Sequence, residues 1–193
     1  MRALLAFLFI LLPTAALAHA GHGETGLLLG FAHPPAGIDH VLAMVAVGIL
    51  AFALGGRALM LVPLAFVGMM AAGFLLGLAG LDLPFVEFGI ALSILVIGGA
   101  AALGRPLPVA GAMALVGAFA LFHGQAHGSE MPADASALLY ALGFIAATAV
   151  LHLAGIGAAF GTAALAGSYG RPLSRIAGGV LAFGGVGVLA GWL

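Results

Sequence analysis

Two pairs of histidines stand inside apolar stretches of the chain, where ionisable side chains are rare. His33 and His40 are seven residues apart, close to two helical turns, and His123 and His127 are four apart, so each pair shares one face of a continuous helix. An ionisable group near the centre of a bilayer costs about 2.5–3.5 kcal/mol on insertion scales, and it persists where it pairs, lines a cavity or functions. Two such pairs favour a functional role over buried structural histidines.

Two carboxylates and a fifth histidine accompany these pairs. Asp39 directly precedes His40, Glu130 is three residues beyond His127, and His152 lies in the middle of a later apolar stretch. Neutral imidazoles bind borderline divalent metals such as Ni²⁺, Co²⁺, Cu²⁺ and Zn²⁺, whereas Mg²⁺ and Ca²⁺ prefer oxygen ligands. The chain has no cysteine, so thiolate ligands are excluded. These residues predict a divalent transition-metal site in which Asp39 offsets the charge of the ion. For His152 and Glu130 taken singly, a structural or solvated role stays open.

Two further histidines lie close to the N-terminus. Residues 1–18 combine a positively charged start, an apolar core and a small-residue end, which predicts a secretory signal peptide cleaved after Ala18. His19 is then the mature N-terminus, and together with His22 it forms an extracytoplasmic segment over residues 19–26 that is suited to collecting metal ions. An uncleaved signal anchor and an uninvolved polar tail are the alternatives.

The composition places the chain in a membrane. Hydrophobic residues make up 64% and charged residues 6%, with a mean hydropathy of +1.31, whereas a soluble domain averages about 25% charged residues. The net charge of -1 gives no indication of the basic surface that binds nucleic acid. The 32 glycines, among long apolar runs, indicate closely packed transmembrane helices.

Arginine and proline divide the mature chain into apolar stretches of the length that a bilayer requires. The expected spans are residues 27–54, 58–81, 85–103, 108–128, 137–165 and 176–193. Alternate connections carry Arg57, Arg105, Arg171 and Arg175, whereas the others carry Asp82, Glu130 and Asp134. Because positive residues favour the cytoplasmic side, we predict an all-α integral protein of the bacterial inner membrane. Six transmembrane helices in residues 27–193 follow the signal peptide, and both mature termini are extracytoplasmic.

Pro34 and Pro35 interrupt the first span. Proline suits a first helical turn and cannot donate a backbone hydrogen bond, so the sequence predicts a second helical segment that starts near Pro34. Broken helices expose backbone groups that transporters use at ion sites. Met44, four residues beyond His40, is interpreted as core packing, and Glu87 as a solvated residue at a helix start.

These motifs resemble those of the HupE/UreJ family, the hydrogenase- and urease-accessory nickel permeases. The matching elements are the start "HAGHGE", "HPPAGIDHVLAM" in the first span, "FHGQAHGSE" in the fourth and the short "LHLAG" in the fifth. The resemblance covers the whole mature chain and implies a secondary transporter for Ni²⁺, or in some members Co²⁺. It assigns the motif positions to the following residues: His33, Asp39, His40, His123, His127, Glu130 and His152.

The expected function is therefore import of a divalent metal ion for metalloenzyme maturation, with the ion bound transiently and no prosthetic group. No P-loop motif is present to couple the chain directly to ATP. The alternative is an intramembrane zinc hydrolase acting on a lipid amide, in which three histidines and an aspartate hold Zn²⁺ with one open position. Against it, the chain has neither HExxH nor GxSxG. The expected partners are the metal ion and the lipid bilayer, with no nucleic acid, and the sequence leaves a homo-oligomer open.

Overall fold

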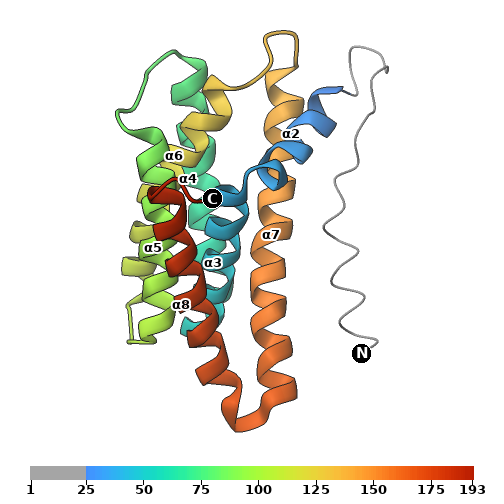
Figure 1. The fold of residues 1–193 in the computed structure, drawn as a ribbon. Coiled ribbons are helices and arrows are strands. Elements are labelled where there is room, and N and C mark those ends of the chain that lie inside the picture. Colours follow the sequence, from blue (N-terminus) through green and yellow to red (C-terminus); the bar gives the residue numbers. More distant parts are fainter. Residues whose placement is uncertain (1–24) are drawn as a thin grey trace.

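Helices make up nearly all of the chain that the structure describes (Figure 1). The structure is a computed structural model and describes residues 25–193. Within these residues it contains no strand. The helices are α2 (Thr25–Ala36), α3 (Ile38–Leu54), α4 (Ala58–Leu78), α5 (Val86–Leu103), α6 (Val109–Ser129), α7 (Ala137–Ala166) and α8 (Gly170–Leu189), with a 3₁₀ turn η2 (Gly167–Tyr169) before α8. The predicted all-α class is confirmed.

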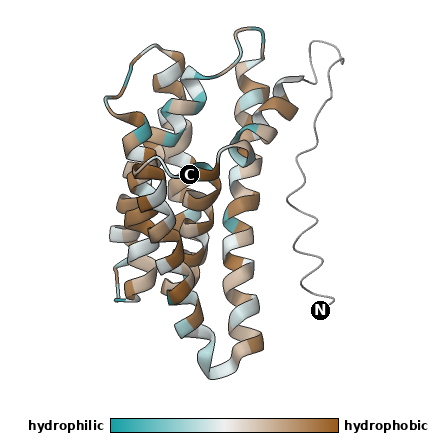
Figure 2. Cartoon of the chain, in the orientation of Figure 1, coloured by the Kyte–Doolittle hydropathy of each residue, from teal (hydrophilic) through white to brown (hydrophobic). Residues whose placement is uncertain are grey.

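Five of these helices, α4 to α8, are long and apolar enough to cross a membrane, and α2 with α3 forms a sixth, bent candidate. Apolar residues make up much of the helices (Figure 2), and many large apolar side chains are exposed on the outside of the bundle; Leu138 on α7, for example, is 70% exposed. Water would penalise such a surface, whereas lipid chains would not. The chain is therefore a multi-pass membrane protein. The predicted signal peptide and the histidines at positions 19 and 22 lie outside the described residues.

The first span bends at Gly37 and not at the prolines. Helix α2 includes Pro34 and Pro35 in its last turn, and α3 starts at Ile38 after a bend of 82°. The prediction of a new segment starting near Pro34 is therefore wrong by about one turn. The prolines weaken the end of α2 by removing backbone donors, but Gly37, with extended dihedral angles of −95° and 121°, turns the chain.

Several helix boundaries also differ from the sequence expectation: α4 ends at Leu78 and not at residue 81, and α8 ends at Leu189 and not at residue 193. Helix α2 begins at Thr25, within the stretch assigned to the N-terminal segment, and α8 begins at Gly170, several residues before the expected start at 176. Both extensions continue a helix past the apolar stretch, which the backbone allows because a helix satisfies its own hydrogen bonds on either side of the membrane boundary.

Glycines set the closest helix contacts. On α6, a methyl group added at Gly124 would overlap the carbonyl oxygen of Met70 on α4, and one at Gly128 would lie 2.5 Å from the carbonyl oxygen of Phe74. Gly30 on α2 contacts the backbone of Tyr140 on α7 in the same way. The helices pack chiefly in the pairs α4 with α6, α5 with α8 and α2 with α7. The glycine-rich composition therefore serves close packing, as predicted.

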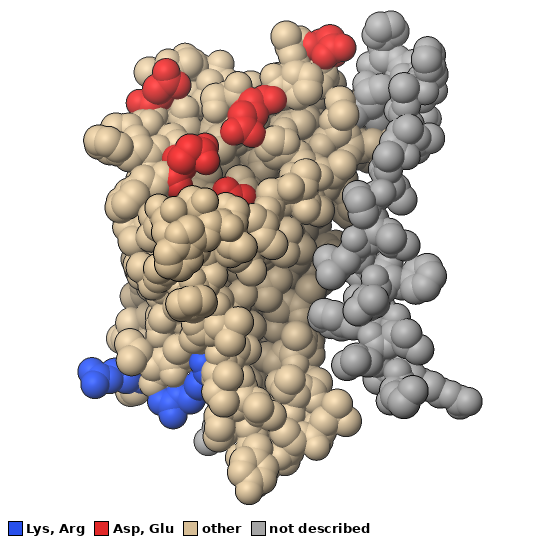
Figure 3. Space-filling model, viewed as in Figure 1, with Lys and Arg blue, Asp and Glu red and all other residues tan. Residues whose placement is uncertain are grey.

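Charged side chains separate to the two ends of the bundle (Figure 3). Arg57 precedes α4, and Arg105 follows α5, so both stand at one end. The opposite end carries Asp82 after α4, Glu87 at the start of α5 and Glu130 after α6. The sequence predicted that connections with arginine and connections with acidic residues alternate along the chain, and the structure places them at opposite ends of the bundle.

Candidate functional site

Four histidine side chains from three helices meet near the acidic end of the bundle. They are His33 on α2, His40 on α3, and His123 and His127 on α6, and we refer to them as the four-histidine cluster. The ring centres of His127 and His33 are 4.9 Å apart, those of His127 and His40 are 5.0 Å apart, and those of His40 and His123 are 5.1 Å apart. The rings of His33 and His40 are 6.3 Å apart across the bend. The two sequence pairs therefore form one group.

The bend at Gly37 makes this convergence possible. The spacing of His33 and His40 would place them on one face only if the helix were continuous, and the prolines predicted a break; in the structure the two residues belong to two helices that meet at 82°. His33 consequently approaches His127 from the α2 side, whereas His40 approaches it from α3. Phe144 on α7 stacks on the ring of His127, with centres 4.7 Å apart and planes at 15°. Side chains from α2, α3 and α7 thus surround the ring of His127.

Hydrogen bonds orient two of the four rings. Nδ1 of His40 donates to Oδ1 of Asp39 at 2.9 Å, and the same oxygen accepts the backbone N–H of His40 at 2.7 Å. Nδ1 of His123 donates to the carbonyl oxygen of Phe119 at 3.1 Å. A ring that donates through Nδ1 keeps the lone pair on Nε2, which is the arrangement that orients histidine ligands in metal sites.

Ring nitrogens of the cluster are buried without partners. Nε2 of His40, Nε2 of His123 and both nitrogens of His127 have no hydrogen-bond partner. His123 and His127 are fully buried, and His40 is nearly so. A buried polar atom without a partner costs about 1–3 kcal/mol. Several such atoms in one place indicate a site that receives a ligand or water.

Carboxylates surround the entrance to the cluster. Oε2 of Glu130 lies 3.1 Å from Nε2 of His33. A cavity of about 200 Å³ is lined by these two residues together with Asp39, His40 and Glu87. Glu87 was predicted to be a solvated residue at a helix start; it is exposed and in the first turn of α5, but it also faces this cavity. The sequence placed Glu87 at the correct end of the bundle, and nothing in it indicated that the start of α5 faces the start of α3.

The remaining predicted residues lie elsewhere. His152 on α7 is not in the cluster; its ring contacts that of Phe66, with centres 5.1 Å apart, and Phe66 also contacts His123, with centres 5.3 Å apart. Met44 is fully buried and packs in the hydrophobic core, as expected. Among residues 25–193, no three His, Asp or Glu side chains are already arranged around one ion position. The cluster therefore gathers residue types that can bind metal ions, without arranging three of them around one position.

The lack of a side chain at Gly37 leaves space for the pair formed by Asp39 and His40. A methyl group at this position would lie 2.6 Å from Oδ1 of Asp39 and 3.1 Å from Nδ1 of His40. We expect Gly37→Ala to displace the carboxylate and to weaken metal binding about tenfold, which is the usual cost of losing a group that orients a ligand. Isothermal titration of the purified variant with Ni²⁺ measures this change. Gly68→Ala, where an added methyl group meets nothing within 4 Å, is the control, and equal affinities for both variants would contradict the role assigned to the bend.

Comparisons with known proteins agree with the resemblance noted in the sequence. The family described as "HupE / UreJ protein" matches residues 6–188. A protein of Rhizobium leguminosarum bv. viciae, named "Protein HupE", is 46% identical over 183 residues, which cover 93% of this chain and 93% of that protein. Among solved structures, none matches the chain significantly.

Proposed function

The chain belongs to the HupE/UreJ family, and from this premise we propose that it is a secondary transporter that imports a divalent transition-metal ion through the bacterial inner membrane. The foremost substrate is Ni²⁺, followed by Co²⁺, and the ion is destined for metalloenzyme maturation. The observation that carries the proposal is the four-histidine cluster, with its unpartnered ring nitrogens below a cavity rimmed by carboxylates.

The distances between the histidine rings of the cluster suit the binding of one ion by several rings. Two imidazoles that bind one ion through bonds of about 2.1 Å place their ring centres roughly 5 Å apart. The rings of His33, His40 and His123 lie within 4.9–5.1 Å of a neighbouring ring in the cluster. Most of these neighbouring rings meet edge to face. The proposal requires rotation about the side-chain bonds to turn the ring nitrogens toward one ion, because no such position is already formed among residues 25–193.

The donor types favour borderline metals. The cluster supplies imidazole nitrogens and the entrance supplies carboxylate oxygens, while the chain has no thiolate to select softer ions. Asp39 holds the His40 ring and adds negative charge beside it. An ion with two positive charges gains from that carboxylate, whereas an anion would be repelled.

We propose that the acidic end faces outward and the arginine end faces the cytoplasm, in agreement with the positive-inside rule. Both mature termini are then extracytoplasmic. His19 and His22 collect the ion, Glu87 and Glu130 attract it to the entrance, and the four-histidine cluster binds it. A membrane potential that is negative inside favours entry by about 2.3 kcal/mol per charge per 100 mV. The zinc-hydrolase alternative finds no support in the family match.

Uptake into liposomes tests this proposal. Purified protein is reconstituted, and accumulation of Ni²⁺, Co²⁺ and Zn²⁺ is measured with and without a proton gradient and a membrane potential. We expect protein-dependent accumulation of Ni²⁺ that competes with Co²⁺ and increases with a potential negative inside. Equal accumulation in liposomes that lack the protein would refute transport.

Acidification is expected to weaken metal binding. Only a neutral imidazole binds a metal ion, so protons compete with the ion for the same ring nitrogens. The affinity for Ni²⁺ should therefore fall as the pH is lowered into the range where the ligand imidazoles take up protons. Titration calorimetry of the purified protein over a series of pH values measures the change. An affinity for Ni²⁺ that stays constant down to the pH at which the protein unfolds would contradict imidazole ligands.

A further inference from the structure

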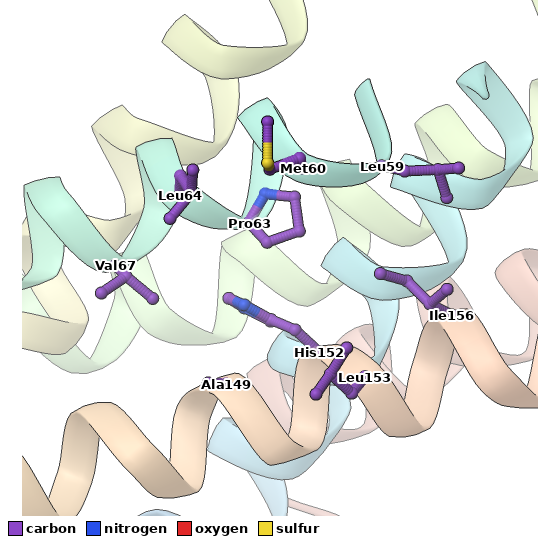
Figure 4. Close-up of a pocket in the computed structure, with 9 residues that line it drawn as sticks. All are labelled: Leu59, Met60, Pro63, Leu64, Val67, Ala149, His152, Leu153 and Ile156. Carbon is purple, nitrogen blue, oxygen red and sulfur yellow. The ribbon is translucent and has the colours of Figure 1, made fainter. Parts of the chain in front are cut away.

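Two buried polar side chains of α7, Tyr140 and His152, have no hydrogen-bond partner among residues 25–193. His152 points toward a cavity between α4 and α7 whose other lining residues are apolar (Figure 4). Tyr140 instead lies beside the four-histidine cluster, with its ring centre 5.9 Å from that of His33. None of the sequence motifs includes Tyr140, so its hydroxyl group has no assigned role.

A buried hydroxyl group without a partner lowers the stability of a folded protein, because the group has lost its hydrogen bonds to water. Tyr140 is 1% exposed, and phenylalanine would fill the same space without this cost. A buried tyrosine usually has a hydrogen-bond partner for its hydroxyl group. The hydroxyl group of Tyr140 therefore indicates a contact that forms during function.

Three aromatic rings surround that of Tyr140. The ring of Phe74 on α4 stacks on it, with centres 6.3 Å apart and planes at 23°, and the rings of Phe144 and His33 have their centres 5.9 Å away. Phe74 and Phe144 have no polar side-chain atom. His33 is therefore the one of these three rings with which the hydroxyl group of Tyr140 can form a hydrogen bond.

Close backbone contacts hold Tyr140 and His33 together. A methyl group added at Gly30 on α2 would overlap the carbonyl oxygen of Tyr140, and one at Gly143 on α7 would overlap that of Leu27. Backbone atoms packed this closely leave little room for α2 to shift along α7. The hydroxyl group of Tyr140 and the ring of His33 are thus kept as neighbours.

Two other histidines of the cluster show how such a ring is oriented. Nδ1 of His40 and Nδ1 of His123 each bond to an oxygen atom, which leaves Nε2 free to bind an ion. In His33 it is Nε2 that is paired, with Oε2 of Glu130 at 3.1 Å. To bind an ion as the other two do, His33 must release Glu130 and have an oxygen acceptor for Nδ1.

We propose that Tyr140 is a positioning residue for the transported ion: its hydroxyl oxygen accepts a hydrogen bond from Nδ1 of His33 when Nε2 of this ring turns from Glu130 to the ion. The inference rests on the proposed function. The phenol oxygen is a neutral acceptor, so it orients the imidazole without adding charge. Exchange of Glu130 for Tyr140 lets His33 bind the ion without leaving a ring nitrogen unpaired.

Tyr140→Phe removes one hydroxyl group and keeps the ring, which makes it a direct test. We expect the affinity for Ni²⁺, measured by titration calorimetry on purified protein, to fall about tenfold. We expect the melting temperature without added metal to equal or exceed that of wild type, because the variant loses a buried hydroxyl group without a partner. Tyr169→Phe is the matched control, since Tyr169 is the only other tyrosine and is 71% exposed, and it should leave both values unchanged.

Ultraviolet difference spectroscopy reports the hydrogen bond itself, because the absorption of a phenol ring shifts when its hydroxyl group gains a partner. Addition of Ni²⁺ to wild type and to Tyr169→Phe should produce a tyrosine difference band, and addition to Tyr140→Phe should not. A tyrosine that serves packing alone would give no such band.

Three results would overturn the role of Tyr140: wild-type affinity in Tyr140→Phe, a difference band that this variant retains, or a lowered melting temperature, which would assign the hydroxyl group to packing. These results leave the transport function intact as long as His40→Ala abolishes binding. Binding of Ni²⁺ by the wild-type protein that does not depend on His40 would instead refute the proposed function itself.

Discussion

His40→Ala is expected to abolish metal uptake and to reduce the affinity for Ni²⁺ by about 100-fold or more. The ring of His40 is 5.0 Å from that of His127 and 5.1 Å from that of His123, and it is the one that Asp39 orients. Alanine removes an imidazole and also leaves the carboxylate without its partner. Titration calorimetry on purified protein measures the affinity, and liposome uptake measures the transport.

A matched series distinguishes loss of a ligand from misfolding. Ile38→Ala removes a side chain that is 51% exposed in the first turn of α3, and it should leave both affinity and uptake near wild type. Asp39→Asn keeps the volume but removes the charge, and we expect an intermediate loss of about tenfold. Wild-type uptake by His40→Ala would show that the four-histidine cluster is not the site of transport.

Gly124→Ala is expected to lower both stability and transport, although no ligand is changed. A methyl group at this position would overlap the carbonyl oxygen of Met70 on α4. Backbone atoms cannot turn aside as a flexible side chain can, so α6 must move away from α4. Overpacking of this kind typically costs about 1–3 kcal/mol. The displacement also moves the neighbouring His123 relative to His40, so metal affinity should fall as well.

Thermal unfolding in detergent, followed by circular dichroism or by dye binding, measures the stability of this variant. Gly68→Ala on α4 and Gly99→Ala on α5 are the controls, because an added methyl group at either position meets nothing within 4 Å. Both controls should be neutral or slightly stabilising, since alanine is the better helix former. A Gly124→Ala variant that melts at the wild-type temperature would contradict the close α4–α6 contact.

The membrane helices could largely be read from the sequence. The expected span boundaries at 58, 103 and 137 coincide with the start of α4, the end of α5 and the start of α7. Arginine, proline and capping residues interrupt the apolar runs at these positions. The start of α8 could not be located in this way. Its first residues are polar, and hydropathy reports what lies in the lipid and not where a helix begins.

The composition of the site was predictable, but its geometry was only partly so. The spacing of His123 and His127 correctly placed both on one face of α6, and the rings of both lie beside that of His40. The sharp bend at Gly37 was placed one turn too early, because a glycine that is needed for space gives no distinctive signal in the sequence. The approach of Glu87 to the cavity and the contact of His152 with Phe66 depend on contacts between distant helices, which local spacing does not encode.

X-ray absorption spectroscopy of the purified protein saturated with Ni²⁺ tests the central claim most directly, because it reports the ligands of the bound ion. The account predicts at least two imidazole nitrogens at about 2.1 Å, with the multiple-scattering signature of histidine rings. His40→Ala should remove one of them in a spectrum recorded at saturating metal. A nickel ion surrounded only by oxygen ligands, or identical spectra for wild type and His40→Ala, would contradict the assignment of the four-histidine cluster as the metal site.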